Sequence, residues 1–263
     1  MKKSLIVLGL CAAATLLAQG PPLGRGRMGP GGPGGMMGMG RTVTGAPYSA
    51  QEVTEETQTL SNGNVITRKV QANVYRDSSG RMRTERTVPA GHPAPGQTAA
   101  QTSTRTVVTI HDPVAGVSSE LDTTAKTAHQ MNLPNFRGAN PNFQGRPGRE
   151  ANGGANDANV VSTDLGMQTI NGVQATGKRV TRTIPAGQIG NAQPIQIVTE
   201  TWQSPDLKIP VMVKRSDPRN GTVVTQLTNI TRAEPDPSLF QVPSDYTVTK
   251  GRGARGGGQV VKQ

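Results

Sequence analysis

The chain has 263 residues, a formal net charge of +11, and 33 glycines and 20 prolines, which together make up about a fifth of it. Leu, Ile, Val and Phe contribute 50 residues, about 19% of the chain, just under the ~20% below which charged chains are typically disordered. Such a composition excludes a multi-span membrane protein, a coiled coil and a disulfide scaffold.

Residues 1–18 have the pattern of a secretory signal peptide. Two lysines follow Met1, and the apolar stretch Ser4–Leu17 is shorter than the ~20 residues that a membrane-spanning helix needs. Ala18 is a small residue that suits a cleavage site, and an uncleaved anchor is the alternative. Cys11, the single cysteine, lies within this segment, so the cleaved chain would contain none. We therefore expect an exported protein of the periplasm or outer envelope.

Four segments have a composition that opposes folding. Residues 19–43 form a linker rich in Gly, Pro and Met, residues 90–103 are rich in Ala, Pro and Gln, and residues 132–159 are rich in Asn, Gly and Pro. Residues 250–263 form a basic, glycine-rich tail. Such segments bury too little apolar surface to offset the entropy lost on ordering. We expect them to be disordered, the third as a central insertion in one domain that spans residues 44–249.

The remaining residues have the composition of β-strands. The chain contains 30 Thr and 24 Val, whose branched side chains favour strands, and short turn motifs recur between the candidate strands. These motifs are Asn62-Gly63, Asp77–Gly80, Asn171-Gly172, Ser204–Asp206 and Asn220-Gly221. We predict a mostly β fold, an antiparallel meander of about nine to eleven strands with one buried and one exposed face.

Three local patterns refine this prediction. Alternate residues from Leu207 to Val213 are apolar, as in a strand with one buried face. Pro210 within that run predicts an edge position or a bulge, because proline cannot donate to the hydrogen-bond ladder. Ser49–Glu52 fits a helix capping box, but the Thr-rich residues that follow favour a strand over Val53–Leu60.

Sequence motifs for catalysis, metal binding and cofactor binding are missing. We find no phosphate-binding loop, serine-nucleophile elbow, zinc-protease motif or cysteine spacing typical of zinc sites. His92, His111 and His129 are at least eighteen residues apart, which is typical of scattered surface histidines rather than of a metal site. We therefore predict no catalytic residue, no metal and no cofactor.

Asp112, Asp217 and Asp236 each precede a proline. Paired carboxylates for acid–base catalysis are one interpretation of this repeat. The other is Asx-turn chemistry, in which the carboxylate accepts backbone hydrogen bonds and the proline fixes φ at the end of a strand. We favour the second interpretation, since the carboxylates are spread evenly along the chain.

The positive charge is concentrated at the two ends of the chain. All 17 acidic residues lie between Glu52 and Asp245, and nine of the 28 basic residues lie outside residues 42–249, so the core has 19 basic and 17 acidic residues and a net charge of +2. Arg-Gly repeats in both ends resemble segments that bind nucleic acid, but neither end has an aromatic residue for base stacking. We expect no specific nucleic-acid partner; the ends contact anionic surfaces or serve as spacers.

Two motifs resemble those of exported proteins related to the outer-membrane lipoprotein carrier. Val74–Glu85 resembles a hairpin of that superfamily in which a strand, a D-x-x-G turn and an Arg-rich strand follow one another. Pro237–Tyr246 is similar to its F-x-x-P-x-x-Y ending. With His111–Val117 and Glu200–Leu207, residues 45–248 resemble an uncharacterised group of secreted bacterial proteins. The resemblance implies a curved antiparallel half-barrel that holds an acyl chain or a partner on its concave face, and it implies no catalytic residue.

Four aromatic residues are candidates for a ligand pocket on that face. Trp202 is the best of them, since it lies in a predicted strand and interrupts an otherwise polar face. Tyr75, Phe240 and Tyr246 complete the set. Few aromatic residues are available, whereas the carriers that the chain resembles have an aromatic-rich cavity. The alternative is that Trp202 fills the core, because large aromatic side chains dominate core packing.

Two functions follow from these patterns, and both are non-enzymatic. In the first, an exported envelope protein binds a lipid, a lipoprotein or another apolar ligand on its concave sheet, with an open apolar cavity near Trp202. In the second, the sheet is a structural or protein-interaction module of the cell envelope, with a filled core and an exposed face or edge. An enzyme is the reserve interpretation, because the sequence suggests no nucleophile–base pair.

Overall fold

The computed structural model describes residues 42–89, 104–133 and 158–251. Two compact units divide the chain, residues 1–30 and 31–263, and every described residue belongs to the second. The signal-peptide prediction lies outside the described residues. So do the Ala/Pro/Gln-rich segment and most of the predicted linker, central insertion and basic tail.

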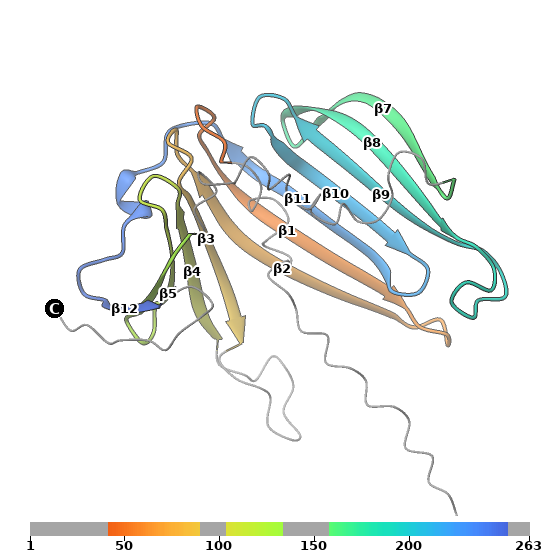
Figure 1. Ribbon diagram of the computed structural model, residues 1–263, viewed down its shortest axis with the longest axis horizontal. Helices are drawn as coiled ribbons and strands as arrows, with labels where there is room; N and C mark the ends of the chain where they lie inside the picture. The colour runs from red at the N-terminus through yellow and green to blue at the C-terminus, as the bar shows by residue number, and fades with distance from the viewer. Residues whose placement is uncertain (1–41, 90–103, 134–157, 252–263) are drawn as a thin grey trace, which may run out of the picture. The chain divides into compact units, whose positions relative to one another are not determined.

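One open, curved sheet contains all the strands of the described residues (Figure 1). Its strands are β1 (Tyr48–Thr59), β2 (Val65–Arg76), β3 (Met82–Pro89), β4 (Thr104–Asp112), β5 (Val117–Asp122), β6 (Thr127–Asn132), β7 (Val160–Ile170), β8 (Val173–Ile184), β9 (Ile195–Ser204), β10 (Ile209–Asp217), β11 (Gly221–Thr231) and β12 (Thr247–Gly251). The predicted mostly β fold with a curved antiparallel sheet is confirmed. The described strands number twelve rather than nine to eleven.

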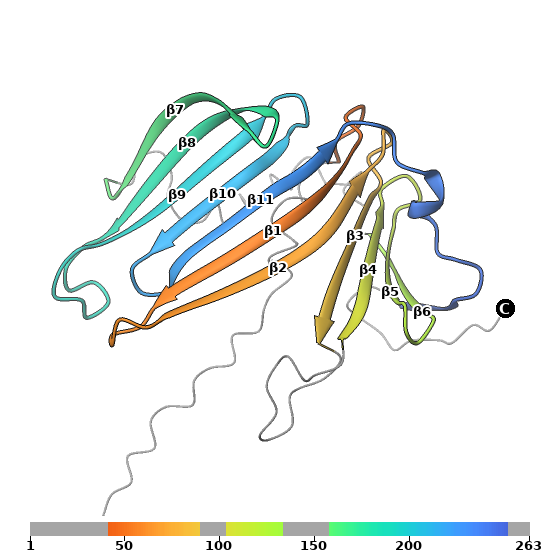
Figure 2. The same ribbon diagram turned by 180° about the vertical axis from the view of Figure 1, so that it is seen from behind.

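Two antiparallel meanders meet in the middle of the sheet (Figures 1 and 2). Strands β1 to β6 follow one another on one side and β7 to β11 on the other, and β1 pairs with β11 where the two series meet. Strand β12 pairs in parallel with β6 at the far edge. The prediction of a single meander is therefore wrong, because turn motifs specify neighbouring hairpins and carry no information on strands that lie about 170 residues apart.

The five predicted turn motifs connect consecutive strands, as expected. Asn171 and Gly172 form the two-residue turn between β7 and β8, with φ values of 48° and 81°. Positive φ at both positions is the requirement of a tight hairpin turn, and Asn-Gly is a pair that adopts it with little strain. The Asn171 side chain also donates to the backbone oxygen of Leu227 at 2.7 Å, so this turn is tied to β11.

Pro210 lies at a bulge, one of the two positions predicted for it. Strand β10 pairs with both β9 and β11, and its register to β9 shifts between Pro210 and Met212. The segment Ser49–Glu52, where a helix cap competes with a strand in the sequence, lies in β1 together with most of Val53–Leu60. The Thr-rich composition therefore outweighs the capping pattern.

Two groups of buried apolar side chains lie on opposite faces of the sheet. The Trp202 cluster consists of Tyr48, Ala50, Val74, Val173, Ala175, Trp202, Leu207, Ile209, Val211 and Leu227. The Leu121 cluster consists of Val108, Ile110, Leu121 and Ala128. Val74 is in register with Thr84, which is in register with Thr109, so these three side chains share a face. Val108 and Ile110 flank Thr109 and point to the other face. The prediction of one buried face is therefore wrong, since the buried face changes along the width of the sheet.

The segment between β11 and β12 covers the Leu121 cluster, against which Val242, Tyr246 and Val248 pack. A short 3₁₀ helix, η3 (Pro237–Phe240), lies early in this crossing and contacts β3 and β4. The crossing ends where the Thr247 N–H donates to the Lys126 carbonyl oxygen at 2.9 Å. The crossing is long because six strands, β1 to β6, lie between β11 and β12 in the sheet.

Candidate functional site

Trp202 lies on β9 and is only 7% exposed. Its cross-strand neighbour on β8 is Gly177, and a Cβ atom placed on Gly177 would lie 2.7 Å from the Cζ3 atom of the indole ring. The same Cβ atom would lie 2.9 Å from the Cβ atom of Leu165 on β7. No side chain fits at these distances, so the indole ring lies directly on the β8 backbone and requires glycine there.

The indole N–H of Trp202 is buried and has no hydrogen-bond acceptor among the residues that the structure describes. Buried tryptophan N–H groups usually find a partner, and an unpaired one costs on the order of 1–3 kcal/mol. The group can donate only, so its missing partner must be an atom with a free lone pair. A water oxygen meets that requirement, and so does a carbonyl, ester or hydroxyl oxygen of a bound molecule.

Half-buried apolar side chains from β7, β10 and β11 pack against the Trp202 cluster; they are Leu165, Ile170, Met212 and Ile230, and we call them the rim. Each rim side chain keeps part of its surface exposed. An apolar group lying against the rim would remove that surface from water, which is worth ~25 cal/mol per Å². The unpaired donor and the rim together have the chemistry of a site for an apolar molecule with one hydrogen-bond acceptor.

Arg76 fixes one side of the Trp202 cluster. The residue is 1% exposed, and its guanidinium lies 4.8 Å from the centroid of the Tyr48 ring. Its guanidinium donates to the carbonyl oxygen of Ala46 at 2.9 and 2.6 Å and to that of Leu207 at 2.6 Å. Burial lowers the pKa of Arg76, and burial also raises the pKa of Tyr48 to about 12. The guanidinium therefore joins three parts of the chain: the segment before β1, strand β2 and the β9–β10 turn.

Glu52 lies at the border of the same cluster, on β1 opposite Leu227 of β11. It is 4% exposed and has no hydrogen-bond partner among the described residues. Burial raises the pKa of this carboxyl to about 7, and the charge of Arg86 opposes the rise. Beside it, the buried hydroxyls of Thr54 and Thr225 are hydrogen-bonded to each other at 2.9 Å. Glu52 therefore changes its charge near neutral pH without a direct hydrogen-bond partner in the described chain.

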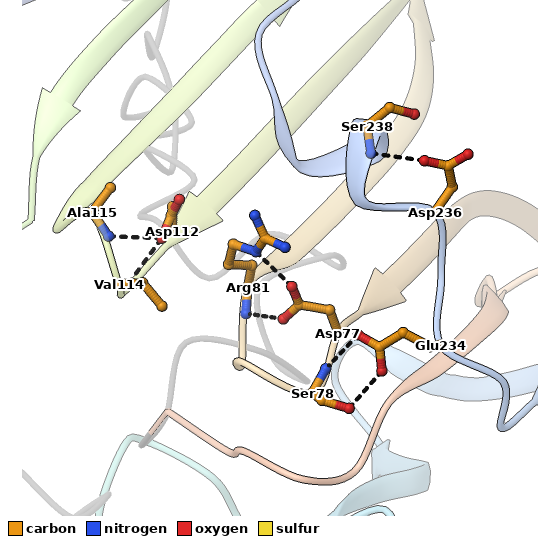
Figure 3. A network of polar contacts seen from close by, with 9 residues as sticks. All are labelled: Asp77, Ser78, Arg81, Asp112, Val114, Ala115, Glu234, Asp236 and Ser238. Atoms are coloured by element: carbon orange, nitrogen blue, oxygen red, sulfur yellow. Dashed lines mark hydrogen bonds and ion pairs between the residues drawn. The ribbon is translucent and has the colours of Figure 1, made fainter.

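Two carboxylates organise the β2–β3 turn, and one of them, Glu234, links it to the segment that follows β11 (Figure 3). The Asp77 carboxylate accepts from the backbone N–H and the Nε of Arg81 at 2.8 and 2.5 Å. The Glu234 carboxylate accepts from the N–H and the hydroxyl of Ser78 at 3.0 and 2.5 Å. The donors are Ser78 of the D-x-x-G turn and Arg81 directly after it, so these carboxylates organise structure and are not arranged for acid–base chemistry.

The three Asp-Pro pairs are Asx turns, as predicted. The Asp112 carboxylate accepts from two backbone N–H groups of its own turn at 2.9 and 2.8 Å, and Asp236 accepts from the Ser238 N–H at 2.8 Å (Figure 3). Asp217 accepts from the backbone N–H of Arg219 at 3.0 Å. The Arg219 guanidinium also binds this carboxylate, which lowers the pKa of Asp217 to about 2.

The structure separates the four predicted pocket residues. Trp202 belongs to the Trp202 cluster, whereas Tyr246 packs against the Leu121 cluster on the opposite face. Tyr75 is half-buried and pairs with Arg83 on β3, which in turn pairs with Ile110 of the Leu121 cluster on β4. Register partners share a face of the sheet, so Tyr75 points to the face of the Leu121 cluster. Phe240 is buried in η3, which contacts β3 and β4. Trp202 is therefore apart from the other three.

Within the described ranges, no three His, Cys, Asp or Glu side chains are close enough to hold a metal ion. Burial lowers the pKa of His111 on β4. His129 contacts the Thr249 hydroxyl of β12 at 3.2 Å, and His92 lies outside the described residues. In this part of the chain, no helix has the length and apolar character needed to cross a membrane.

Motif searches do not single out Glu52, Arg76 or Gly177. A signal for Glu52 exists in the sequence, since it has the same strand parity as Tyr48 and Ala50 and is buried on their face. Gly177 also carries a signal, because glycine inside a strand often marks a close approach. Arg76 is indistinguishable in sequence from the other arginines of its hairpin, and only its long-range contacts show that it is buried.

Comparison with known proteins finds no matching family model and no matching curated protein. The Pseudomonas aeruginosa MucA/MucB complex aligns over 83% of this chain and 59% of the other, with 13% identity and a TM-score of 0.40. The chain thus spans less than two thirds of that protein. LprF from Mycobacterium bovis aligns over 73% of this chain and 90% of its own, with 15% identity and a TM-score of 0.30.

A LolA superfamily protein from Nitrosomonas europaea aligns over 74% of this chain and 90% of its own, with 9% identity and a TM-score of 0.25. Its superfamily is the one that the sequence motifs resemble. All three TM-scores lie below 0.5, and we draw no functional inference from them.

Proposed function

We propose that this protein is a non-enzymatic, exported envelope protein that binds an apolar ligand at the Trp202 cluster, with a lipid or the acyl part of a lipoprotein as the ligand class. The observation that carries the proposal is the buried, unpaired N–H of Trp202 inside an apolar cluster with a half-buried rim. A pure hydrocarbon would leave that N–H unpaired, so the ligand has an ester, carbonyl or hydroxyl oxygen. Export is inferred from the signal pattern of residues 1–18.

The polar groups around the cluster support binding rather than catalysis. Arg76 donates to backbone carbonyl oxygens and holds the fold together. The hydroxyls of Thr54 and Thr225 bond to each other and not to the Glu52 carboxyl. A hydrolase or transferase needs a nucleophile within hydrogen-bond reach of a base, and the described part of this cluster offers no such pair.

Tyr75, Phe240 and Tyr246 stay predicted ligand contacts. They lie on the side of the Leu121 cluster and the C-terminal crossing, away from Trp202. We assign them a second apolar contact, made by a ligand or an envelope partner that lies along the crossing. Trp202 alone then defines the primary site.

One observation favours the alternative function, a structural or protein-interaction module with a filled core. Ala175, Val211 and Leu227 in the Trp202 cluster have no exposed surface, so that part of the cluster is closed. In this alternative the Trp202 N–H stays unpaired and the rim is ordinary protein surface. The two functions differ in whether an added apolar molecule reaches the indole.

The test uses Trp202 itself, because it is the only tryptophan in the chain. We expect monoacyl phosphatidylcholine, added below its micellar concentration, to shift the tryptophan emission saturably. Ile230→Asp on the rim should abolish the shift. Val242→Asp, at a half-buried position on the opposite face, is the matched control and should leave the shift intact.

Circular dichroism of both variants is the control for the β fold, and we expect both to keep it. No shift in the natural chain, or the same loss in both folded variants, would contradict the proposal and favour the filled core. Native mass spectrometry of the protein purified from its own envelope gives an independent result, because a bound acyl molecule should appear as a discrete added mass.

A further inference from the structure

Two opposite charges lie in one otherwise apolar row of side chains that crosses the sheet. Glu52 on β1 pairs with Ala72 on β2, and Ala72 pairs with Arg86 on β3; Figure 1 shows these strands side by side. We call these three residues the charged row. Leu227 on β11 continues the row beyond Glu52, and Val107 on β4 continues it beyond Arg86. Register partners share a face of the sheet, so the carboxyl and the guanidinium lie on one face between apolar neighbours.

Neither charged side chain has a hydrogen-bond or ion-pair partner among the residues that the structure describes. Glu52 is 4% exposed and Arg86 is half-buried. Their strands are separated by β2, which places their Cα atoms ~10 Å apart, and Ala72 between them contributes only a methyl group. The charge of Arg86 acts on the carboxyl through space without a hydrogen bond. The charged row therefore lacks a donor for Glu52 and an acceptor for Arg86.

The two missing partners define the chemistry of a ligand. An ionised carboxylate only accepts hydrogen bonds, and buried charges are normally paired, so a cationic N–H donor suits Glu52. A guanidinium only donates, and its planar fork matches the oxygens of a phosphate. A phosphoethanolamine head group carries both a primary ammonium and a phosphate. A phosphocholine head group carries the phosphate, but its quaternary ammonium has no N–H.

The charged row borders the apolar Trp202 cluster directly. Ala50 lies two residues before Glu52 and on the same face of β1, and Leu227 lies opposite Glu52. Both belong to the Trp202 cluster. At the other end of the row, the half-buried Arg86 keeps part of its surface in contact with solvent. A polar row next to an apolar cluster matches the order of head group and acyl chain in an amphiphile.

We propose that the charged row binds the head group of a phospholipid that has a primary ammonium, with the ammonium at Glu52, the phosphate at Arg86 and the acyl chain at the Trp202 cluster. The inference rests on the proposed function and adds the class of head group to it.

Two monoacyl lipids with the same acyl chain test this inference, one with a phosphoethanolamine and one with a phosphocholine head group. Both have the phosphate and no net charge, so they differ in the N–H donors that reach Glu52. Burial raises the pKa of Glu52 to about 7, and binding is therefore measured from the Trp202 emission at about pH 8, where the carboxyl is ionised. We expect the ethanolamine lipid to bind about tenfold more tightly, because hydrogen bonds between charged groups are the strong ones.

Glu52→Gln should bring the ratio of the two affinities to about one, since glutamine carries no charge to attract the ammonium. Arg86→Gln should instead weaken both lipids, because both carry the phosphate. Glu55→Gln is the matched control, an exposed glutamate of the same strand, and it should keep the preference of the natural chain.

Equal affinities for the two lipids in the natural chain would overturn this inference and leave the proposed function standing, because both lipids would still shift the emission. A preference that persists in Glu52→Gln would also overturn it. No shift with either lipid would remove the proposed function and this inference together.

Discussion

Replacing the buried Glu52 with glutamine should flatten the pH dependence of stability between about pH 4.5 and about pH 7. Burial raises the pKa of this carboxyl from 4.5 to about 7. Within that interval the folded chain holds a proton that the unfolded chain has already released. The free energy of unfolding is therefore highest below about pH 4.5, falls as the pH rises, and becomes level above about pH 7 as far as this group is concerned.

The expected change is large for a single side chain. One pKa unit corresponds to about 1.4 kcal/mol, so a rise of about 2.5 units costs about 3 kcal/mol of stability once Glu52 is ionised. The residue is 4% exposed, so water screens little of this cost. Glutamine is neutral at every pH and has nearly the shape of protonated glutamate. Glu52→Gln should thus match the natural chain near pH 4.5 and exceed its stability by about 3 kcal/mol near pH 8.

Urea denaturation of both chains, repeated at intervals from about pH 4.5 to about pH 8, measures this difference. Other titrations, including that of His111, are common to both chains and cancel. Glu55→Gln is the control, because Glu55 is exposed on the same strand. Parallel stability profiles for the natural chain and Glu52→Gln would refute the reasoning, and so would a flattening that Glu55→Gln reproduces.

Three further substitutions test the contacts that hold the sheet. Gly177→Ala places a Cβ atom 2.7 Å from the Trp202 ring and should lower the free energy of unfolding by ~1–3 kcal/mol and change the tryptophan emission; no effect on either would contradict the contact. Arg76→Met leaves buried carbonyl oxygens unpaired and should cost about 3 kcal/mol in urea denaturation, and complete rescue by Arg76→Lys would show that the guanidinium fork is not needed. Asp217→Asn removes a carboxylate whose pKa Arg219 lowers to about 2. This shift contributes ~2 kcal/mol of stability above about pH 4, which the natural chain loses as the pH falls towards 2. The free energy of unfolding should therefore fall less steeply with decreasing pH in the variant than in the natural chain.

The hairpins of this fold can be predicted because their chemistry is local. Asn171 and Gly172 adopt the positive φ values that a tight turn requires, and Asp112 accepts the backbone hydrogen bonds expected of an aspartate before proline. A few neighbouring residues determine each of these features. Pro210 falls in the same class, since a missing N–H at a known position leaves only an edge or a bulge.

The central pairing of β1 with β11 has no such local signal. Thr54 and Thr225 form a buried hydrogen-bonded pair, but threonine is frequent throughout the chain and suits any neighbouring strand equally well. The parallel addition of β12 is equally hidden, because its five residues resemble those of an antiparallel strand. Alternation within one strand also does not show which face of the assembled sheet is buried. For this reason the sequence assigns Trp202 and Tyr246 to the same face, whereas they lie on opposite faces in the structure.

Trp202 must satisfy packing and hydrogen bonding at the same time, and only packing is satisfied by the described chain. Its ring lies on the backbone at Gly177, and the atoms in contact, Cζ3 and Cη2, belong to the six-membered ring of the indole. A buried indole N–H without an acceptor costs on the order of 1–3 kcal/mol, which a residue that only fills the core would avoid by lacking the nitrogen. An oxygen of a bound apolar molecule removes that cost, and the distinction between a filled core and a ligand site therefore rests on this nitrogen atom more than on the curvature of the sheet.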